Sequence, residues 1–385
     1  MKIAVLRESV ATEKRVCIVP DSLKRLAQKK IEVVAEAGIG LGASIADADY
    51  VAGGATVEPT AEAAIAGADL VMRIRIPTVD EVQKLKPGSS LVAPIYPLVN
   101  HDLVKALAAQ KITTFAVDAI PRTTLAQMMD VLSSQASVAG YCAVLVSANL
   151  LPRFFPMLMT AAGTIAPATA LILGAGVAGL QAIGVARRLG ARVEAFDVRK
   201  VVKEQVESLG AKFVEVDSDE DAQTKSGYAK EVSEEYKKKQ AEALARHVAK
   251  ADVVICTALI PGRRAPVLVT EDMVKAMKPG SVIVDLAAEQ KGNCELTEPG
   301  QTVVKHGVTL VGELDFPSRL PVHASQMYSR NMEKLLFHLT KDGALVMDQS
   351  EEITKGCLIT HAGEVVHERT REAMGLEAAK KEGAA

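Results

Sequence analysis

Three closely spaced glycines form the strongest chemical signal in this sequence of 385 residues. Gly174, Gly176 and Gly179 follow the apolar run Ala170–Leu173 and precede a helical pattern. In this arrangement the first glycine permits a tight turn, the second lets the backbone approach a phosphate, and the third allows close helix packing. The unpaired N–H groups at the start of the helix would then face the phosphates. The motif indicates a site for a dinucleotide pyrophosphate, and the alternative is a glycine turn that binds no ligand.

An acidic residue stands at the distance along the chain that is expected for the ribose of such a dinucleotide. The strand-like run Arg192–Phe196 ends at Asp197, whose carboxylate can accept hydrogen bonds from both ribose hydroxyl groups. The same negative charge would repel a 2′-phosphate, so the sequence favours NAD(H) over NADP(H). Arg199 follows closely and weakens this argument, because a guanidinium attracts phosphate.

A second group of polar side chains lies between an apolar strand-like run and a long helical pattern. The segment 120–130 contains Arg122, Gln127 and Asp130, close to the expected start of that helix. An amide side chain beside a nicotinamide can fix the orientation of the carboxamide, and an Arg–Asp pair can hold the loop. The alternative is an N-terminal helix cap with a solvated ion pair.

Three further segments are candidates for ligand contact. The polar segment 217–228 is longer than a usual strand–helix connection, which is typical of a mobile lid, and a tolerated surface loop is the alternative. The segments 258–266 and 285–287 each follow the end of a strand-like run. Ligands of open α/β sheets lie at such carboxyl ends, so both positions are candidate binding edges.

Several other kinds of chemistry have no matching pattern. The histidines are dispersed, without an HExxH motif or a Cys–His pairing, so we expect no metal site. The five cysteines show no CxxC spacing, which favours buried thiols over a disulfide framework. No GxSxG or P-loop lysine motif is present. A net charge of −2 without a basic stripe argues against nucleic acid as a partner.

The glycine loop opens a series of alternating strand and helix patterns. Its helical patterns begin near residues 178, 203, 231 and 270. Such alternation predicts parallel strands covered by helices on both faces, and hence a complete doubly wound domain. The strands of this domain are placed at 170–173, 192–196, 212–216, 252–257, 281–286 and 308–311.

The first third of the chain shows the same alternation of elements. Asp21 can cap the helix that follows it, and 101–110 is another helical pattern. Strand-like runs lie at 2–6, 31–35, 70–74, 90–95 and 113–117. Two long helices, at about 124–151 and 326–341, would carry the chain into the second domain and out of it.

These patterns predict an α/β protein of two Rossmann-like, doubly wound domains, the second inserted in the first and linked to it by long helices. The first domain would comprise residues 1–135 and 320–385, and the NAD(H)-binding domain residues 136–319. The polar, Ala/Gly-rich tail 371–385 is expected to be frayed.

The sequence predicts no membrane-spanning segment. The N-terminus lacks the long apolar stretch of a signal peptide, and no segment reaches the roughly 18 uninterrupted apolar residues that a bilayer requires. The nearest candidate, 136–151, is broken by polar residues and is expected to be a mostly buried helix. The chain is therefore expected to be soluble, and it could still dock on a membrane partner.

Several segments together resemble one known family. The run 122–141, RTTLAQMMDVLSSQASVAGY, is similar to the RQD loop and following helix of proton-translocating transhydrogenases. The segments 152–164, 257–262 and 292–294 resemble the NAD(H)-binding component, domain I, of the same enzymes. The resemblance covers essentially the whole chain. It points to the separate NAD(H)-binding portion of the alpha subunit in three-subunit bacterial enzymes, which are related to alanine dehydrogenase.

The resemblance implies roles for two sets of residues. Gln127 would hold and reorient the nicotinamide, and Arg122 and Asp130 would serve the hydride step beside it. Around the nicotinamide, the implied set is Arg122, Gln127, Met128, Met129, Asp130 and Ser133. For the pyrophosphate, the adenosine ribose and a mobile loop that closes over the nucleotide, the implied set is Gly174, Gly176, Val177, Gly179, Asp197, Val198, Arg199, Gly227, Tyr228 and Leu259.

The implied reaction is direct hydride transfer from NADH to NADP⁺. NADP(H) would sit on another subunit, and membrane proton-channel subunits would couple the transfer to proton translocation. The hydride step needs no protein acid or base, so the contribution of this chain would be positioning. The resemblance also implies a homodimer, with surface from the helix 326–341 and the segment 136–151, and a cytoplasmic location peripheral to the inner membrane.

Two alternative functions remain open. The substrate site of alanine dehydrogenase uses an Arg, a Lys and a His. This chain keeps Arg15, has Arg75 where the Lys would be expected, and has Tyr96 where the His would be. Without that His there is no evident general acid or base for oxidising an amine. The other alternative is a regulatory NAD(H) sensor without catalysis, which no sequence feature demands.

Overall fold

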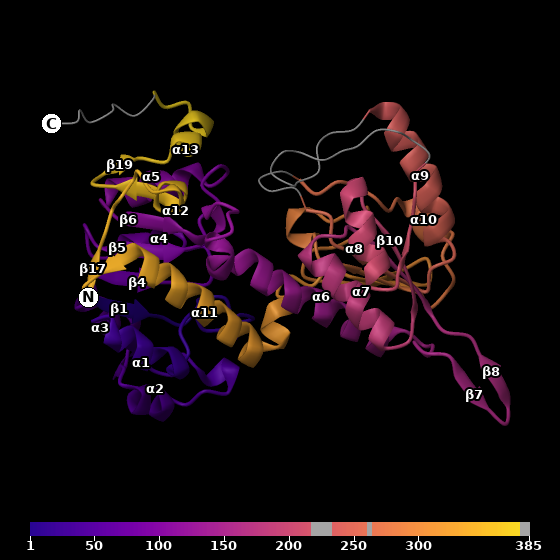
Figure 1. Cartoon of the computed structure of the whole chain (residues 1–385), viewed down its shortest axis with the longest axis horizontal. Coiled ribbons are helices and arrows are strands. Elements are labelled where there is room, and N and C mark those ends of the chain that lie inside the picture. The colour runs from indigo at the N-terminus through magenta and orange to yellow at the C-terminus, as the bar shows by residue number, and fades with distance from the viewer. Residues whose placement is uncertain (217–232, 260–263, 378–385) are drawn as a thin grey trace. The chain divides into compact units, whose positions relative to one another are not determined.

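The chain forms two compact units, the second inserted between the two segments of the first (Figure 1). In this computed structural model, residues 1–216, 233–259 and 264–377 are described. The first unit comprises Met1–Gln135 and Ser318–Ala385, and the second comprises Ala136–Pro317. Each unit contains a mainly parallel sheet with helices, which confirms the predicted α/β class with two Rossmann-like domains.

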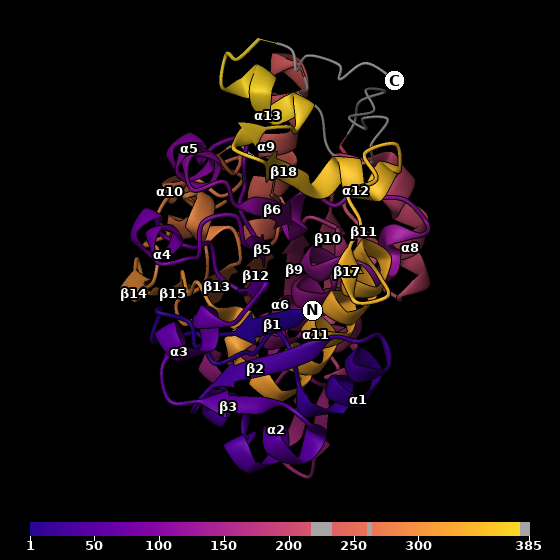
Figure 2. The ribbon, with the colours of Figure 1, turned by 90° about the vertical axis from the view of Figure 1, so that its left-hand side faces the viewer.

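The first unit is built on an eight-stranded sheet in the order β19-β18-β6-β5-β4-β1-β2-β3. Figure 2 shows β18, β6, β5, β1, β2 and β3 following one another in this order. The pairings from β6 to β3 are parallel, whereas β18 and β19 join as antiparallel strands. The strands are β1 (Lys2–Val5), β2 (Glu32–Glu36), β3 (Thr56–Glu58), β4 (Leu70–Met72), β5 (Ser90–Ala93), β6 (Thr113–Ala116), β18 (Leu358–His361) and β19 (Glu364–Val365).

Helices cover both faces of this sheet because successive strand side chains point to opposite sides. Ile3 and Val5 of β1 belong to one apolar core, and Ala4 between them belongs to the other. The first core includes residues of α1 (Pro20–Gln28), α2 (Asp47–Gly53), α11 (Pro321–Leu339) and α12 (Glu352–Cys357). The second core includes residues of α3 (Ala61–Ala66), α4 (Val79–Gln83) and α5 (His101–Ala109).

The second unit carries a seven-stranded sheet in the order β11-β10-β9-β12-β13-β15-β14. All pairings are parallel except that between β14 and β15. The chain moves outward from β9 to β11 and then crosses to the other side of β9, so the strand order reverses between β9 and β12. The strands are β9 (Thr169–Leu173), β10 (Arg192–Phe196), β11 (Lys212–Phe213), β12 (Val253–Cys256), β13 (Val282–Asp285), β14 (Thr302–Lys305) and β15 (Val308–Val311).

The helices of the second unit also pack on its sheet. α7 (Val177–Arg188) contacts β9, β10 and β12, and α8 (Lys203–Ser208) contacts β11. Residues of α9 (Glu234–Val248) and α10 (Glu271–Lys275) share an apolar core with alternate residues of β9 and β12. This arrangement is the doubly wound fold that the sequence predicted.

The long helix α6 starts later than the sequence suggested. We expected a helix from about 124, but α6 spans Val131–Leu150 and follows a separate 3₁₀ turn, η3 (Ala126–Met129). Asp130 separates them because its backbone is extended, with ψ of 91°. By length and composition α6 is the one helix in the described part of the chain that could cross a membrane, and 44% of its most apolar stretch is buried. Buried core helices of soluble proteins meet the same criterion.

Other boundaries also differ from the expectations. The helix expected at 326–341 is α11, Pro321–Leu339, because Pro321 provides a favourable first turn. Val19, rather than Asp21, precedes the first residue of α1, and no side chain caps that helix. The tail expected to be frayed from residue 371 is helical up to Ala373 in α13 (Glu368–Ala373), where the Arg371 guanidinium donates to backbone carbonyls.

The sequence did not predict several short elements. An exposed hairpin of β7 (Leu158–Thr160) and β8 (Gly163–Ile165) extends from the second unit (Figure 1). A second small pair consists of β16 (Thr340–Lys341) and β17 (Ala344–Leu345). The remaining 3₁₀ turns are η1 (Leu41–Ala43), η2 (Val117–Ala119), η4 (Lys200–Val202), η5 (Ala288–Gln290) and η6 (Phe316–Arg319).

Candidate functional site

The glycine loop lies between β9 and α7, beside the point where the strand order of the second unit reverses. Gly174 has φ of +101°, a backbone conformation that residues with a side chain rarely adopt. Its N–H donates to the Phe196 carbonyl over 2.8 Å. A Cβ on Gly179 would lie 1.9 Å from the Gly174 carbonyl oxygen, so only glycine permits this packing. Two of the three predicted glycine roles thus have a visible geometric cause.

Gly176 supplies the third role, the approach of a ligand to the backbone. It precedes the first residue of α7, no side chain caps the helix, and an added Cβ would meet no atom within 4 Å. The uncapped N–H groups of the first turn and the partial positive charge of the helix end suit a phosphate group. The space above Gly176 and these donors therefore fit the pyrophosphate of a dinucleotide.

Asp197 follows β10 and lies beside the glycine loop, as the sequence predicted, but its carboxylate is already fully engaged. One oxygen accepts from the Ala175 N–H over 2.8 Å and from Arg199 Nη2 over 2.7 Å. The other accepts from the Arg199 N–H and Nε, both over 2.9 Å. The hydrogen bond to Asp197 raises the pKa of Arg199. A ribose could therefore reach this carboxylate only if the Arg199 side chain moved away.

The residues after β12 brace the glycine loop. The Thr257 hydroxyl lies 2.9 Å from the Gly174 carbonyl oxygen and 3.2 Å from that of Leu173. Leu259 is 45% exposed and Val177 is also exposed, so both can contact a ligand. Val198 instead packs against the apolar core of the second unit, which leaves chiefly its backbone for such a contact.

The segment of Gln127 lies in the first unit and is organised around Asp130. Asp130 caps α6, since its carboxylate accepts from the Ser133 N–H over 2.9 Å and the Ser133 hydroxyl over 2.6 Å. Asn331 of α11 donates to the Met128 carbonyl over 2.8 Å and so holds η3 in place. This geometry matches the helix cap that the sequence left open as an alternative.

The residues expected to surround the nicotinamide differ in side-chain exposure: some are exposed, and one is buried. Gln127, Met128 and Arg122 are exposed or partly exposed and can reach a ligand. Met129 instead belongs to the apolar core of the first unit, so only its backbone remains for contact. Gly227 and Tyr228, together with the expected lid 217–228, lie outside the described residues.

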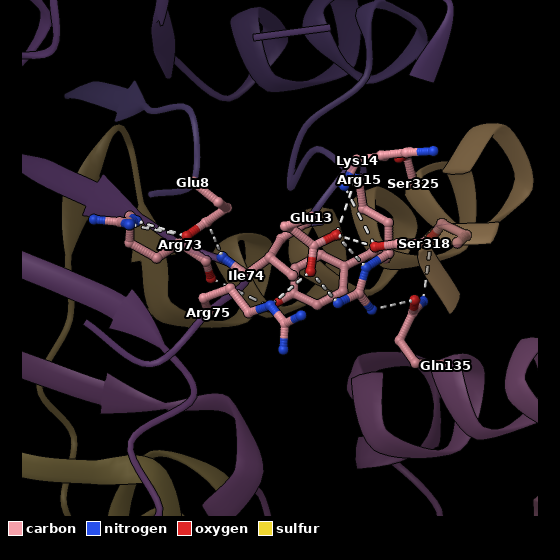
Figure 3. Close-up of polar contacts among 12 residues, drawn as sticks. Glu8, Glu13, Lys14, Arg15, Arg73, Ile74, Arg75, Gln135, Ser318 and Ser325 are labelled. Carbon is pink, nitrogen blue, oxygen red and sulfur yellow. Dashed lines mark hydrogen bonds and ion pairs between the residues drawn. The ribbon is translucent and has the colours of Figure 1, made fainter. Parts of the chain in front are cut away.

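A buried charged cluster in the first unit was not predicted as a group (Figure 3). Glu13 lies between two guanidinium groups. Its oxygens are 2.6 and 2.7 Å from Arg15 nitrogens and 2.8 Å from Arg75 Nε. The Ser318 hydroxyl donates to the same carboxylate over 2.7 Å, and Arg15 Nη1 donates to Gln135 Oε1 over 2.9 Å. The Glu13 side chain is fully buried, so both arginines are held by one internal carboxylate.

A second group of contacts in the cluster surrounds Arg73. Its guanidinium lies 2.9 Å from Glu8 and 2.9 Å from Glu81, and the Ile74 N–H donates to Glu8 over 2.7 Å. Burial raises the pKa of Glu8 even though Arg73 opposes this shift. Burial would also raise the pKa of Glu13, but hydrogen bonding and attraction by Arg15 outweigh it and lower this pKa to about 2.

The position of this cluster is that of a ligand crevice in an open α/β sheet. Glu8 and Glu13 follow β1, and Arg73 and Arg75 follow β4, where the strand order of the first unit reverses. Three carboxylates face three guanidinium groups, so the cluster carries no excess positive charge for an added carboxylate.

Tyr96 stands where a catalytic His was expected for alanine dehydrogenase chemistry. It follows β5, has φ of +48°, and donates its N–H to Asp118 over 2.9 Å. Its side chain is 37% exposed. The described residues bring together no group of three or more possible metal ligands. All five cysteines are buried and outside disulfides, as predicted for buried thiols.

Comparisons with known proteins agree with this architecture. The family profile "Alanine dehydrogenase/PNT, N-terminal domain" matches residues 4–139, and the corresponding C-terminal domain matches residues 143–368. An NAD(P) transhydrogenase alpha-subunit protein of Rhodospirillum rubrum is 49% identical over 95% of this chain and 98% of its own length.

Solved structures give the same result. A transhydrogenase from Sinorhizobium meliloti has a TM-score of 0.82 and 42% identity, covering 95% of this chain and 99% of that one. An L-alanine dehydrogenase has a TM-score of 0.80 at 26% identity, covering 97% of this chain and 99% of that one. The chain therefore belongs to the alanine dehydrogenase/PNT family.

Proposed function

We propose that this chain is the NAD(H)-binding component of a proton-translocating transhydrogenase. It would present NADH for direct hydride transfer to NADP⁺ held on a partner subunit. Membrane subunits would couple the transfer to proton translocation, so the chain would work in the cytoplasm at the inner membrane. The identity to the Rhodospirillum rubrum protein, 49% over nearly the whole chain, supports the transhydrogenase branch of the family.

The geometry of the glycine loop is the single observation that carries the nucleotide-binding part of the proposal. The turn at Gly174 and the close packing at Gly179 bring the uncapped start of α7 up to β9, and the space above Gly176 leaves room there for a pyrophosphate. The amides of the first turn would bind the phosphate oxygens. No side chain of the chain has to be charged for this step.

The residues around η3 would serve the other end of the nucleotide. NADH, when bound, supplies the hydride. Gln127 would hydrogen-bond the carboxamide of the nicotinamide and fix its orientation, and exposed Met128 would limit access of water. Asp130 and Ser133 would act indirectly, since their mutual hydrogen bonds fix the start of α6. Arg122, which is exposed on the segment before η3, would place a positive charge near the nicotinamide.

Nucleotide preference would depend on Asp197 and Arg199 together. A ribose that displaces Arg199 gains a carboxylate acceptor for its hydroxyl groups, which favours NAD(H). The displaced guanidinium stays close, however, and would lessen the repulsion of a 2′-phosphate. We therefore infer a preference for NAD(H) that is smaller than an unpaired acidic residue would give.

The alanine dehydrogenase alternative is less consistent with the first unit. Arg15 and Arg75, the residues expected to bind the substrate, are both held by Glu13. A small carboxylate would have to compete with that buried internal carboxylate. Tyr96 supplies no imidazole to accept a proton from an amine, so amino-acid oxidation has no evident base.

We also propose a homodimer. Of the two segments expected to supply its surface, the helix 326–341 corresponds to α11, and residues 136–151 lie largely in α6. The apolar face of α11 is buried in its own unit, with Leu335, Leu336 and Leu339 fully covered. The hairpin β7–β8 is exposed on both strands, with Met159 76% exposed. An isolated two-stranded hairpin is marginal in water, so a second copy of the chain is the proposed cover. Sedimentation should show that the purified chain is a dimer and that the variant Met159→Asp is a monomer.

The replacement Gln127→Asn tests the proposed role in hydride transfer. Shortening the side chain by one methylene moves the amide away from the nicotinamide without adding charge. We expect the rate of single-turnover hydride transfer to fall by roughly a hundredfold, as misplacement of about 1 Å can cause. The Kd for NADH, measured by fluorescence titration, should change by less than about threefold. A loss confined to affinity would contradict the positioning role.

A further inference from the structure

One buried side chain, Asn293, holds the backbone of Ala258, which follows β12, and of Pro266. Its Oδ1 accepts from the Ala258 N–H over 3.0 Å. Its Nδ2 donates to the carbonyls of Ala258 and Pro266, each over 2.8 Å. The amide therefore joins Ala258, the residue before Leu259, to Pro266. Asn293 itself is fully buried, so its amide depends on these bonds for hydrogen-bond partners.

Asp285 at the end of β13 holds Asn293 in this position. The Asp285 carboxylate accepts from the N–H groups of Asn293 and Cys294 over 2.8 and 3.0 Å. The Thr297 hydroxyl and the Ala287 N–H complete its shell over 2.7 and 3.0 Å. A Cβ at Gly292, where φ is +76°, would lie 2.6 Å from Asp285, so the turn requires glycine.

Thr257, the residue before Ala258, is bonded to the glycine loop. Thr257 donates its hydroxyl to the Gly174 carbonyl, and its N–H donates to Leu173 over 2.7 Å. Polar contacts thus run from Asp285 through Asn293 to Ala258, and from the adjacent Thr257 to Gly174. They link the carboxyl ends of three neighbouring strands, β13, β12 and β9.

We propose that Asn293 is a positioning residue for nucleotide binding. It fixes the backbone at Ala258, and through it the Thr257 brace under the glycine loop and the exposed Leu259. The inference rests on the proposed NAD(H) binding and adds to it a residue that does not touch the nucleotide. Without the amide, one N–H and two carbonyls of Ala258 and Pro266 lose this partner, and the backbone there must rearrange to recover hydrogen bonds.

The variants Asn293→Asp and Asn293→Ala test this assignment. The aspartate keeps the size of the side chain and one acceptor, but it places an oxygen against the two carbonyls that Nδ2 now faces. The alanine removes all three bonds. For both variants we expect the Kd for NADH to rise at least about tenfold, which corresponds to about 1.4 kcal/mol. Hydrogen exchange at residues 264–269 should accelerate, and residues 174–178 should need about tenfold more NADH for the same protection.

Asp252→Asn is the matched control in the same sheet. Asp252 is also buried and also binds backbone, accepting from the Thr169 N–H over 2.9 Å, but it lies at the amino ends of β9 and β12. We expect this variant to lower the melting temperature about as much as the Asn293 variants and to keep the wild-type Kd for NADH. If NADH affinity fell only because the protein was less stable, the Kd for NADH would rise in all three variants alike.

Two results would overturn the inference. One is NADH affinity within twofold of wild type in both Asn293 variants. The other is an equal loss of affinity in Asp252→Asn, which would reduce Asn293 to a stabilising residue. If a variant at 293 failed to fold, Thr257→Val, which removes the brace at Gly174, would take its place with the same expected rise in Kd. Failure of the wild-type chain itself to bind NADH would refute the proposed function instead.

Discussion

The replacement Gly140→Ala tests how closely α6 must approach the nucleotide-binding helix. Gly140 lies within α6, and a Cβ there would be 2.1 Å from the Ala178 carbonyl oxygen. It would also lie 2.9 Å and 3.0 Å from two further backbone atoms of Ala178. Ala178 is in the first turn of α7, beside Val177. The obstacle is backbone, which cannot rotate away as a side chain can.

The expected magnitude follows from two opposing effects. Ordinary contact begins at 3.4 Å, so the 2.1 Å separation is 1.3 Å too short and α6 or the start of α7 must move by about that distance. Replacing a helical glycine by alanine favours folding by up to about 1 kcal/mol, whereas overpacking costs about 1–3 kcal/mol. We therefore expect the unfolding free energy to fall, by no more than about 3 kcal/mol.

The same movement should weaken nucleotide binding. The first turn of α7 provides the amides proposed to bind pyrophosphate, so its displacement should raise the Kd for NADH about tenfold. Calorimetric unfolding and fluorescence titration measure the two effects. Gly184→Ala is the matched control, because a Cβ there meets only Arg188 at 3.9 Å. The control should be as stable as wild type or more so. A Gly140→Ala variant with equal stability and equal Kd would refute the reasoning.

Three further replacements give distinct expectations. Gly176→Ala should leave the melting temperature unchanged, since nothing lies within 4 Å of the new Cβ, yet raise the Kd for NADH at least about tenfold; unchanged affinity would contradict the pyrophosphate assignment. Asp197→Ala should weaken NADH binding and narrow the NADH-to-NADPH affinity ratio, and parallel titrations would expose a constant ratio if Asp197 had no such role. Glu13 has a pKa lowered from 4.5 to about 2, so its stabilisation is present above pH 4.5 and is lost as pH falls towards 2. Glu13→Gln should flatten the dependence of melting temperature on pH in that window, and an unchanged slope would count against the ion-pair assignment.

The nucleotide-binding loop could be predicted from sequence because its determinants are local. The tight turn, the missing Cβ atoms and the helix start all fall within Gly174–Gly179. The family resemblance was also readable and is confirmed by the comparisons. The later start of α6 had a local signal as well, since Asp130 immediately precedes α6 and Asp is a favoured N-cap residue.

The buried cluster could not be predicted because it depends on distant segments. The carboxylate of Glu13 receives a hydrogen bond from Ser318, 305 residues away in the chain. Arg15 and Arg75 were identified as separate residues, but their shared partner appears only when β1 and β4 lie side by side. The hydrogen bonds from Arg199 to Asp197 were not predicted for another reason. They depend on the direction of the Arg199 side chain, which sequence spacing does not reveal.

The Asn293 contacts depend partly on local sequence motifs and partly on segments that are distant in the chain. The segment 292–294 was identified through resemblance, and 258–266 and 285–287 through their places after strands. Their connection required β13 and β12 to be neighbours, which the order of strands along the chain does not reveal. The motif was visible in the sequence, whereas its partners belong to the fold.

Transfer of a labelled hydride tests the central claim most directly. The chain would be mixed with the NADP(H)-binding subunit of a transhydrogenase, NADH carrying deuterium at the reactive carbon, and NADP⁺. We predict that the deuterium appears in NADPH without exchange with solvent, and that pyruvate and ammonia cause no oxidation of NADH. NADH oxidation that requires pyruvate and ammonia, with no deuterium in NADPH, would contradict the account. Tight NADH binding without either reaction would also contradict it and would leave the sensor function.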